Sequence, residues 1–197
     1  IIKDHMEIGG FVALGMMTEG EIVIKDALPE HMYKILFEYS KLGVKTKWNG
    51  NDLIVPDQKN YKIKNMIGDQ MNKIESLIWP GFPTDILQIM LVAATRADGE
   101  ILIHEKLFEE RLFFYDQLRR MGAKVIMCDP HRVVVTGPVK LKGSKLNATD
   151  LRAGMALMIA ALSARGVSEL SNAEEIDRGY ENIEQRLKNL GAVISRE

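Results

Sequence analysis

The chain has 197 residues, of which 46% are hydrophobic and 27% are charged, and its formal net charge is −1. This length and composition predict a globular protein of one domain, or at most two, with a substantial hydrophobic core. The balanced charge argues against nucleic-acid binding, and each apolar run is shorter than the roughly 18 to 20 residues that cross a bilayer. The single cysteine, Cys128, excludes an internal disulfide and favours a reducing compartment, the cytoplasm.

The first patterned stretch covers approximately residues 1–56. From Gly9 it reads as an apolar helix that ends at Gly20, because a residue able to take positive φ stops a helix readily. The β-prone run EIVIKD follows, and then an amphipathic helix that closes around Gly43 and leads into a strand. The chain begins with Ile instead of Met, which fits a fragment or a processed product.

The second stretch, residues 57–137, repeats this order of elements. Its expected parts are a strand at YKIKNMI or NKIESLIW, an apolar helix from Asp85 to Gly99, the strand EILIHE, an amphipathic helix with Leu112, Tyr115 and Leu118 on one face that closes at Gly122, and the strand RVVVTG. The apolar residues of the amphipathic helix recur at steps of three, which is typical of a helix with one face on a core.

The third stretch, residues 138–197, follows the same plan. Its expected parts are a strand at VKLKGSKLN, an apolar helix from Asp150 to Gly166, the strand VSELSN, and an amphipathic helix with Leu187 and Leu190 that closes at Gly191 before another strand. The two marker glycines of each stretch are 23, 23 and 25 residues apart, so we interpret the three stretches as copies of one unit.

These patterns predict an α/β (α+β) fold made of three βαβαββ units. The first helix of each unit is apolar nearly all round and should be buried, whereas the second should face solvent on one side. A domain with the three buried helices inside, and with sheets and amphipathic helices outside, satisfies both requirements. An ordinary two-layer α/β sandwich is the alternative.

Candidate site residues lie at the starts of the buried helices. Asp85 and Asp150 fall in first turns, where a carboxylate is stabilised by the helix dipole, and Thr84 and Thr149 are candidate N-caps. Capping alone would explain both acids. The same helix ends also offer free backbone N–H groups to an anionic ligand.

Three arginines occupy related places in the units. Arg152 lies in a first turn, where the helix dipole disfavours a cation, so it needs a partner: Asp150, Glu175, or a substrate phosphate or carboxylate. Arg111 and Arg178 each follow acidic residues near the start of a second helix. The three could converge around a common axis, and surface salt bridges are the alternative for each.

Other polar residues are weaker candidates. The four histidines are scattered without ligand spacing, which argues against a metal site. Cys128 lies at a strand end with no basic neighbours, so we expect a buried structural thiol and not a nucleophile. The stretch WPGFP before Asp85 should form a rigid turn that fixes the direction of this acid, with its aromatic rings packed.

Four motifs resemble the UDP-N-acetylglucosamine 1-carboxyvinyltransferases, a family of enolpyruvyl transferases. They are FPTD (82–85), EKLFEERLFF (105–114) followed by LRRMGA, ATDLRA (148–153) and DRGYENIEQRLKNLGA (177–192). The resemblance implies an inside-out α/β barrel and a two-domain enzyme, of which residues 1–197 are a single domain, the C-terminal half. The Lys-Asn pair and the loop residue that acts as general acid would belong to the other domain, so this chain should be inactive alone.

The resemblance also implies the reaction. An enolpyruvyl group passes from phosphoenolpyruvate to the 3-hydroxyl of UDP-N-acetylglucosamine with release of phosphate and without a metal or organic cofactor, at the start of peptidoglycan precursor synthesis. Asp85 matches the base that takes the hydroxyl proton, and Asp150 matches an acid close to the reacting groups. The remaining matches are Arg111, Arg152 and Arg178 around the phosphate and carboxylate of phosphoenolpyruvate, and Leu107 near the uracil.

Two alternatives to this function remain open. A shikimate-3-phosphate enolpyruvyl transferase would share the fold, and a non-catalytic repeat domain could use the arginines only to bind an anionic partner. One departure from the family pattern bears on substrate contacts, because Glu110 stands in FEER where the family commonly has Asn.

Overall fold

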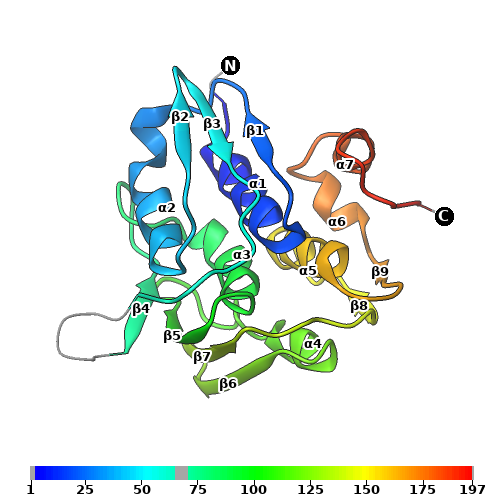
Figure 1. The fold of residues 1–197 in the computed structure, drawn as a ribbon. Coiled ribbons are helices and arrows are strands. Elements are labelled where there is room, and N and C mark those ends of the chain that lie inside the picture. The colour runs from blue at the N-terminus through cyan, green and yellow to red at the C-terminus, as the bar shows by residue number, and fades with distance from the viewer. Residues whose placement is uncertain (1–2, 65–70, 197) are drawn as a thin grey trace.

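The computed structural model describes residues 3–64 and 71–196 as an α/β domain with three related units (Figure 1). Unit 1 contains α1 (His5–Thr18), β1 (Ile22–Ile24), α2 (Pro29–Lys41), β2 (Lys47–Asn49) and β3 (Asp52–Val55). Unit 2 contains β4 (Asn72–Glu75), α3 (Thr84–Ala94), β5 (Gly99–His104), α4 (Tyr115–Arg120), β6 (Lys124–Asp129) and β7 (Arg132–Gly137). Unit 3 contains β8 (Lys145–Asn147), α5 (Leu151–Ser163), β9 (Glu169–Ser171), α6 (Glu174–Asp177) and α7 (Ile183–Asn189).

Unit 2 has the full order of elements that the sequence predicts. Among the described residues, unit 1 has no strand equivalent to β4 and unit 3 has no strand after α7. Of the two strand candidates in unit 2, NKIESLIW contains β4. The other, YKIKNMI, makes one bridge from Lys62 to Asp98, and its last three residues lie outside the described part of the chain.

The three apolar helices form the centre of the domain, as predicted. α1, α3 and α5 lie side by side, with α1 against β1 and β3 and α3 against β5 and β7 (Figure 1). Every residue of α3 from Ile86 to Ala94 is buried, which is what an all-round apolar helix requires. Gly9 allows α1 to approach α3 closely, since a Cβ there would lie 2.8 Å from Ile86 Cδ1.

The strands form three separate sheets. Their orders are β1-β3-β2, β4-β5-β7-β6 and β8-β9, and β4 with β5 and β8 with β9 are the parallel pairs. No hydrogen-bonded pairing joins one sheet to another in the ranges described, so the expected barrel is not closed. The central position of the helices also argues against a two-layer sandwich (Figure 1).

The second glycine of each unit ends a helix as predicted. Gly43, for example, has φ +83° after α2, and its amide donates to the Ser40 carbonyl at 3.0 Å. The first glycines do not end their helices directly. α1 stops at Thr18 because Glu19 already takes a left-handed conformation, and Gly99 is the first residue of β5.

The second helices of units 2 and 3 are shorter than the sequence predicts. Glu110 and Asn182 have φ of +67° and +48°, and a residue in this conformation interrupts a right-handed helix. Leu112 therefore lies in the turn before α4, and the last amphipathic helix is divided into α6 and α7.

Two further observations concern single elements. The expectation of a buried thiol is wrong, because Cys128 is exposed at the irregularity between Met127 and Asp129 in β6. None of the helices in the described part of the chain is long and apolar enough to span a membrane.

Candidate functional site

Three of the predicted site residues meet at the starts of two central helices. Asp85 lies in the first turn of α3, Arg152 in the first turn of α5, and Arg111 in the loop between β5 and α4. Arg111 Nη1 donates to Asp85 Oδ1 at 2.7 Å, and Arg152 Nη2 donates to Asp85 Oδ2 at 2.9 Å. The partner of Arg152 is therefore Asp85, and neither Asp150 nor Glu175.

This cluster of Asp85, Arg111 and Arg152, which we call the Asp-Arg cluster, is partly exposed. The side-chain exposures are 28%, 28% and 19%, so water and a ligand can reach the cluster while its charges are only partly screened. One carboxylate and two guanidinium groups leave a net charge of +1. An anion is therefore the ligand that this arrangement favours.

The capping residues differ from those predicted. The N-cap of α5 is Asp150 and not Thr149, because Asp150 Oδ1 accepts the amides of Arg152 at 2.8 Å and Ala153 at 2.9 Å. The N-cap of α3 is Pro83, with no side-chain hydrogen bond. The Thr84 hydroxyl is not a cap because it donates to Glu105 Oε2 instead.

Arg178 and Leu107 lie outside the ion pairs of the Asp-Arg cluster. Arg178 is 70% exposed and forms an ion pair at 2.7 Å with Glu175, three residues earlier in the chain. For Arg178 the alternative prediction, a surface salt bridge, therefore fits the structure. The structure thus brings two of the three arginines together. Leu107 is 40% exposed in the loop that carries Arg111.

The loop that carries Arg111 is held by several contacts. The Arg111 guanidinium lies over the Phe108 ring, 4.3 Å from its centroid, and the buried Gln88 side chain of α3 donates to the Arg111 carbonyl at 2.8 Å. The left-handed backbone at Glu110 turns the chain at this point. The turn predicted before α3 is present, since the Phe82 carbonyl accepts the Leu77 amide at 2.9 Å, but only one of its two aromatic rings is buried: Phe82 is fully buried and Trp79 is 49% exposed.

Sequence reasoning missed Glu105, which is fully buried below the Asp-Arg cluster. Its Oε1 accepts from Ser76 Oγ at 2.7 Å and from the Leu107 amide at 2.8 Å, and its Oε2 accepts from Thr84 Oγ1. In the sequence it is the last residue of EILIHE, and nothing in that run distinguishes it from a strand-end acid.

Tyr180 shows that the start of α1 also lies near the cluster. Burial raises the pKa of Tyr180, the Arg152 guanidinium partly opposes this, and the carboxylates of Asp4 and Glu7 add to the increase. Asp4 caps α1 and Glu7 is in its first turn. Gly9 of α1 also packs against Ile86 in the first turn of α3, so the starts of α1, α3 and α5 lie around one region, towards which the positive ends of their dipoles point.

Two histidines that look unrelated in the sequence pack together. The rings of His5 and His31 lie 5.5 Å apart, and both contact Trp79, at 4.8 Å and 5.6 Å. Burial lowers the pKa of His5, and Asp4 opposes this effect. Within residues 3–64 and 71–196, no group of three or more His, Cys, Asp or Glu side chains is arranged to hold a metal ion.

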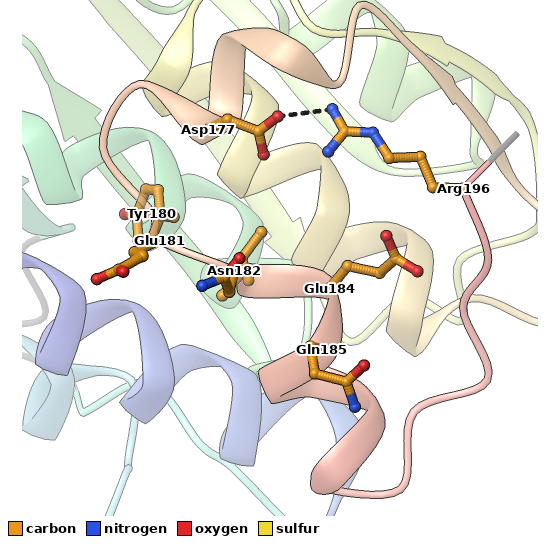
Figure 2. A pocket seen from close by; sticks show the side chains of 8 residues that line it. Asp177, Tyr180, Glu181, Asn182, Glu184, Gln185 and Arg196 are labelled. Carbon is orange, nitrogen blue, oxygen red and sulfur yellow. Dashed lines mark hydrogen bonds and ion pairs between the residues drawn. The ribbon is translucent and has the colours of Figure 1, made fainter.

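Two hollows are lined by residues outside the Asp-Arg cluster. One, of about 390 Å³, is formed by α6, α7 and the chain that follows, and the Asp177–Arg196 ion pair crosses one side of it (Figure 2). Its carboxylates Asp177, Glu181 and Glu184 make it unsuited to an anion. The other, of about 530 Å³, lies between α1, β1 and α7.

The sequence was compared with known families and proteins. Residues 1–187 match the family model described as EPSP synthase (3-phosphoshikimate 1-carboxyvinyltransferase). A UDP-N-acetylglucosamine 1-carboxyvinyltransferase of Bacteroides thetaiotaomicron is 47% identical over the whole chain, which covers 46% of that protein. The enzyme of the same name from Treponema denticola is 46% identical over 97% of the chain, with 45% of that protein covered. The chain thus spans about half the length of the curated relatives it matches.

Solved structures agree in fold. An enolpyruvyl transferase from Streptomyces tendae superposes with a TM-score of 0.85 at 24% identity, covering 99% of this chain and 44% of that one. An EPSP synthase from Acinetobacter baumannii gives a TM-score of 0.69 at 15% identity, with 95% and 45% covered. At these identities the structures establish the fold, and the family follows from the match over residues 1–187: the chain belongs to the EPSP synthase family.

Proposed function

We propose that this chain forms one domain, the C-terminal half, of a two-domain UDP-N-acetylglucosamine 1-carboxyvinyltransferase. The complete enzyme would transfer the enolpyruvyl group of phosphoenolpyruvate to the 3-hydroxyl of UDP-N-acetylglucosamine and release phosphate, in the synthesis of peptidoglycan precursors. Relatives of this name that are 42% to 47% identical and about twice as long support the proposal. Both substrates are charged, water-soluble metabolites, so we place the reaction in the cytoplasm.

The observation that carries the proposal is the position of Asp85 between Arg111 and Arg152. Each carboxylate oxygen has two lone pairs, so one guanidinium bond to each leaves an acceptor position for a substrate hydroxyl. Phosphoenolpyruvate carries a phosphate and a carboxylate, and forked guanidinium donors fit both groups. A proton acceptor and an anion site therefore adjoin one another.

In this proposal Asp85 is the general base. Its carboxylate takes the proton of the sugar 3-hydroxyl as that oxygen bonds to the central carbon of phosphoenolpyruvate, while the double bond opens and its methylene carbon takes a proton from the general acid of the other domain. Loss of a proton from that carbon and of phosphate from the central carbon then restores the double bond. The guanidinium groups of Arg111 and Arg152 stabilise the charge of the anionic substrate. No step requires a metal or an organic cofactor.

The other predicted residues take supporting roles. Asp150 keeps Oδ2 available beside the reacting groups while Oδ1 caps α5, since Oδ2 has only a long contact of 3.4 Å with the Thr149 hydroxyl. Arg178 would leave Glu175 to reach the substrate, and Leu107 would offer an exposed apolar contact to the uracil.

A protein that contains this chain together with a second domain tests the function. We expect phosphate release from phosphoenolpyruvate in the presence of UDP-N-acetylglucosamine and none with shikimate 3-phosphate. Asp85→Asn should lower turnover about 10²- to 10⁴-fold, the usual contribution of a general base. Wild-type turnover in this variant would exclude Asp85 as the base.

The shikimate enzyme is the second candidate, because the matching family model bears its description. Phosphate release with shikimate 3-phosphate alone would favour it. Anion binding without turnover of either pair of substrates would favour a non-catalytic domain.

A further inference from the structure

Glu105 is an unusual residue to find fully buried beside a site for anions. Its carboxylate makes no ion pair with a lysine or arginine anywhere in the described ranges, and the neighbouring Lys106 pairs with Glu75 instead. A buried carboxylate without a cation is costly unless hydrogen-bond donors surround it. Glu105 therefore holds the groups that donate to it with more than ordinary strength.

The donors come from three different segments. Ser76 follows β4, Thr84 begins α3, and Leu107 and Phe108 belong to the loop that carries Arg111. The amides of Leu107 and Phe108 donate to Oε1 at 2.8 Å and 3.3 Å. One side chain thus joins the end of a strand, the start of a central helix and the arginine loop.

The backbone of Glu105 is itself fixed. Its amide donates to the His131 carbonyl at 2.8 Å, and its carbonyl lies 2.8 Å from His131 Nδ1. The Ser76 hydroxyl, in turn, accepts the Lys106 amide at 2.8 Å, and Ser76 is fully buried. The carboxylate is thus a fixed reference point at the ends of the parallel strands β4 and β5.

One oxygen of Glu105 is connected to Asp85 and the other to Arg111, each through a neighbouring residue. Oε2 binds the hydroxyl of Thr84, the residue before Asp85, and the same hydroxyl lies 3.4 Å from Arg111 Nη1. Oε1 binds the amide of Phe108, whose ring supports the Arg111 guanidinium. The relative position of Asp85 and Arg111 therefore depends on one carboxylate.

We propose that Glu105 is a positioning residue, which sets Asp85 against Arg111 through Thr84 and the backbone of the arginine loop. The proposal deepens the proposed function, on which its consequence for turnover rests. Glu105 touches no substrate, and its effect passes through other residues.

The variant Glu105→Gln keeps the shape of the side chain and removes its negative charge, so it tests whether the charge is needed to position Arg111. Its carbonyl oxygen must face the amides of Leu107 and Phe108, because backbone N–H groups cannot reverse their role. Its NH2 group then faces Thr84, whose hydroxyl must accept where it donated before. That oxygen keeps a second lone pair for Arg111 Nη1, but its proton loses the carboxylate that fixed the direction of the hydroxyl, so the hydroxyl can rotate and the arginine is held less firmly.

The first arm of the test uses this chain alone. Hydrogen exchange of the Arg111 Nη–H groups, followed by NMR, reports how firmly the guanidinium is held, because Nη1 donates to Asp85 and Thr84. We expect exchange to be faster by about 10-fold or more in Glu105→Gln and in Thr84→Val, and to be restored in Thr84→Ser, which keeps the hydroxyl. The control is Glu38→Gln, because Glu38 is equally buried but pairs with Lys34 and Lys41 on α2.

The second arm uses a two-domain protein that contains this chain. We expect kcat to fall about 10- to 100-fold in Glu105→Gln and in Thr84→Val, the cost of misplacing a reacting group by about 1 Å. The double variant should be no slower than the slower single variant, because both changes break one connection. Glu38→Gln should lower stability and leave kcat unchanged.

The outcomes separate the two proposals. If the wild-type two-domain protein releases no phosphate, the proposed function fails, and the exchange arm still decides the role of Glu105. If Arg111 exchanges at the wild-type rate in folded Glu105→Gln, the positioning role is wrong. If Glu105→Gln does not fold, Thr84→Val decides, and unchanged exchange in that variant overturns the proposal.

Discussion

The Asp-Arg cluster makes a quantitative prediction about stability. Asp85→Asn keeps the shape of the side chain and removes the charge that two guanidinium groups share at 2.7 Å and 2.9 Å. The three side chains are 19% to 28% exposed. This exposure lies between that of a surface pair, worth about 0 to 1 kcal/mol, and that of a buried pair, whose breakage costs about 3 to 5 kcal/mol. We therefore expect the variant to lose about 1 to 3 kcal/mol of unfolding free energy.

The same substitution should create a tighter site for phosphate. Without the charge of Asp85, the cluster changes from +1 to +2, and the two arginines repel one another until an anion lies between them. Bound ligand adds RT ln(1 + [L]/Kd) to stability, about 1.4 kcal/mol at a phosphate concentration ten times Kd. Phosphate should thus restore much of the lost stability.

Urea unfolding of the chain measures both effects, with sodium phosphate compared against sodium chloride at equal ionic strength. The wild type corrects for the general stabilisation that phosphate gives to folded proteins. Two controls accompany the variant. Asp52→Asn removes a carboxylate of similar exposure, 25%, whose partner Lys25 is 76% exposed, and Asp85→Asn combined with Arg152→Gln removes one of the freed cations. Equal stability of Asp85→Asn and wild type, with equal responses to phosphate, would refute the ion-pair geometry.

Three further predictions concern the central helices. Gly10→Ala should stabilise the chain by about 0.5 to 1 kcal/mol, because a new Cβ at Gly10 makes ordinary contacts at 3.5 Å and beyond. Gly9→Ala should be less stable than Gly10→Ala, because a new Cβ at Gly9 would lie 2.8 Å from the buried Ile86. Thermal unfolding that ranks the two variants in the opposite order would contradict this packing. Asp150→Ala should lower the free energy of unfolding by about 0.5 to 2 kcal/mol, and Asp150→Asn should lower it much less, because Asn caps a helix as well as Asp does. If Asp150→Asn is stable but the two-domain protein that carries it loses most of its turnover, Asp150 has a role beyond capping. Burial lowers the folded pKa of His5 below 6.5, so the unfolded chain binds more protons and the free energy of unfolding should fall as the pH drops below this value. In urea unfolding, His5→Gln should lose less stability at low pH than the wild type. An equal loss of stability in the two proteins would mean that other groups cause it.

The sequence was sufficient to predict the repeated unit and the buried helices, because both are local patterns. An all-round apolar helix such as α3 has no face suited to water, so its burial follows from its residues alone. The shortened second helices could not be predicted in the same way. They depend on left-handed backbone at Glu110 and Asn182, a conformation that is uncommon for any residue except glycine and that the residue type alone does not predict.

The site was predicted residue by residue but not contact by contact. Asp85 and Arg152 are 67 residues apart, and the expected partners of Arg152 were Asp150, Glu175 or a substrate anion. Asp150 instead caps its own helix, where Oδ1 accepts the backbone amides of the same turn. Glu105 was missed because its donors Ser76 and Thr84 lie 29 and 21 residues earlier, and only the fold brings them to it.

The Asp-Arg cluster also explains why equivalent helix starts carry different residues. If α3 and α5 both presented an acid at this place, or both an arginine, like charges would face one another a few ångströms apart. Divergence to Asp85 in one unit and Arg152 in the next turns that repulsion into an ion pair of 2.9 Å across the boundary between units. A single unit could not form it, so an anion site of this kind requires at least two copies packed at the same helix ends.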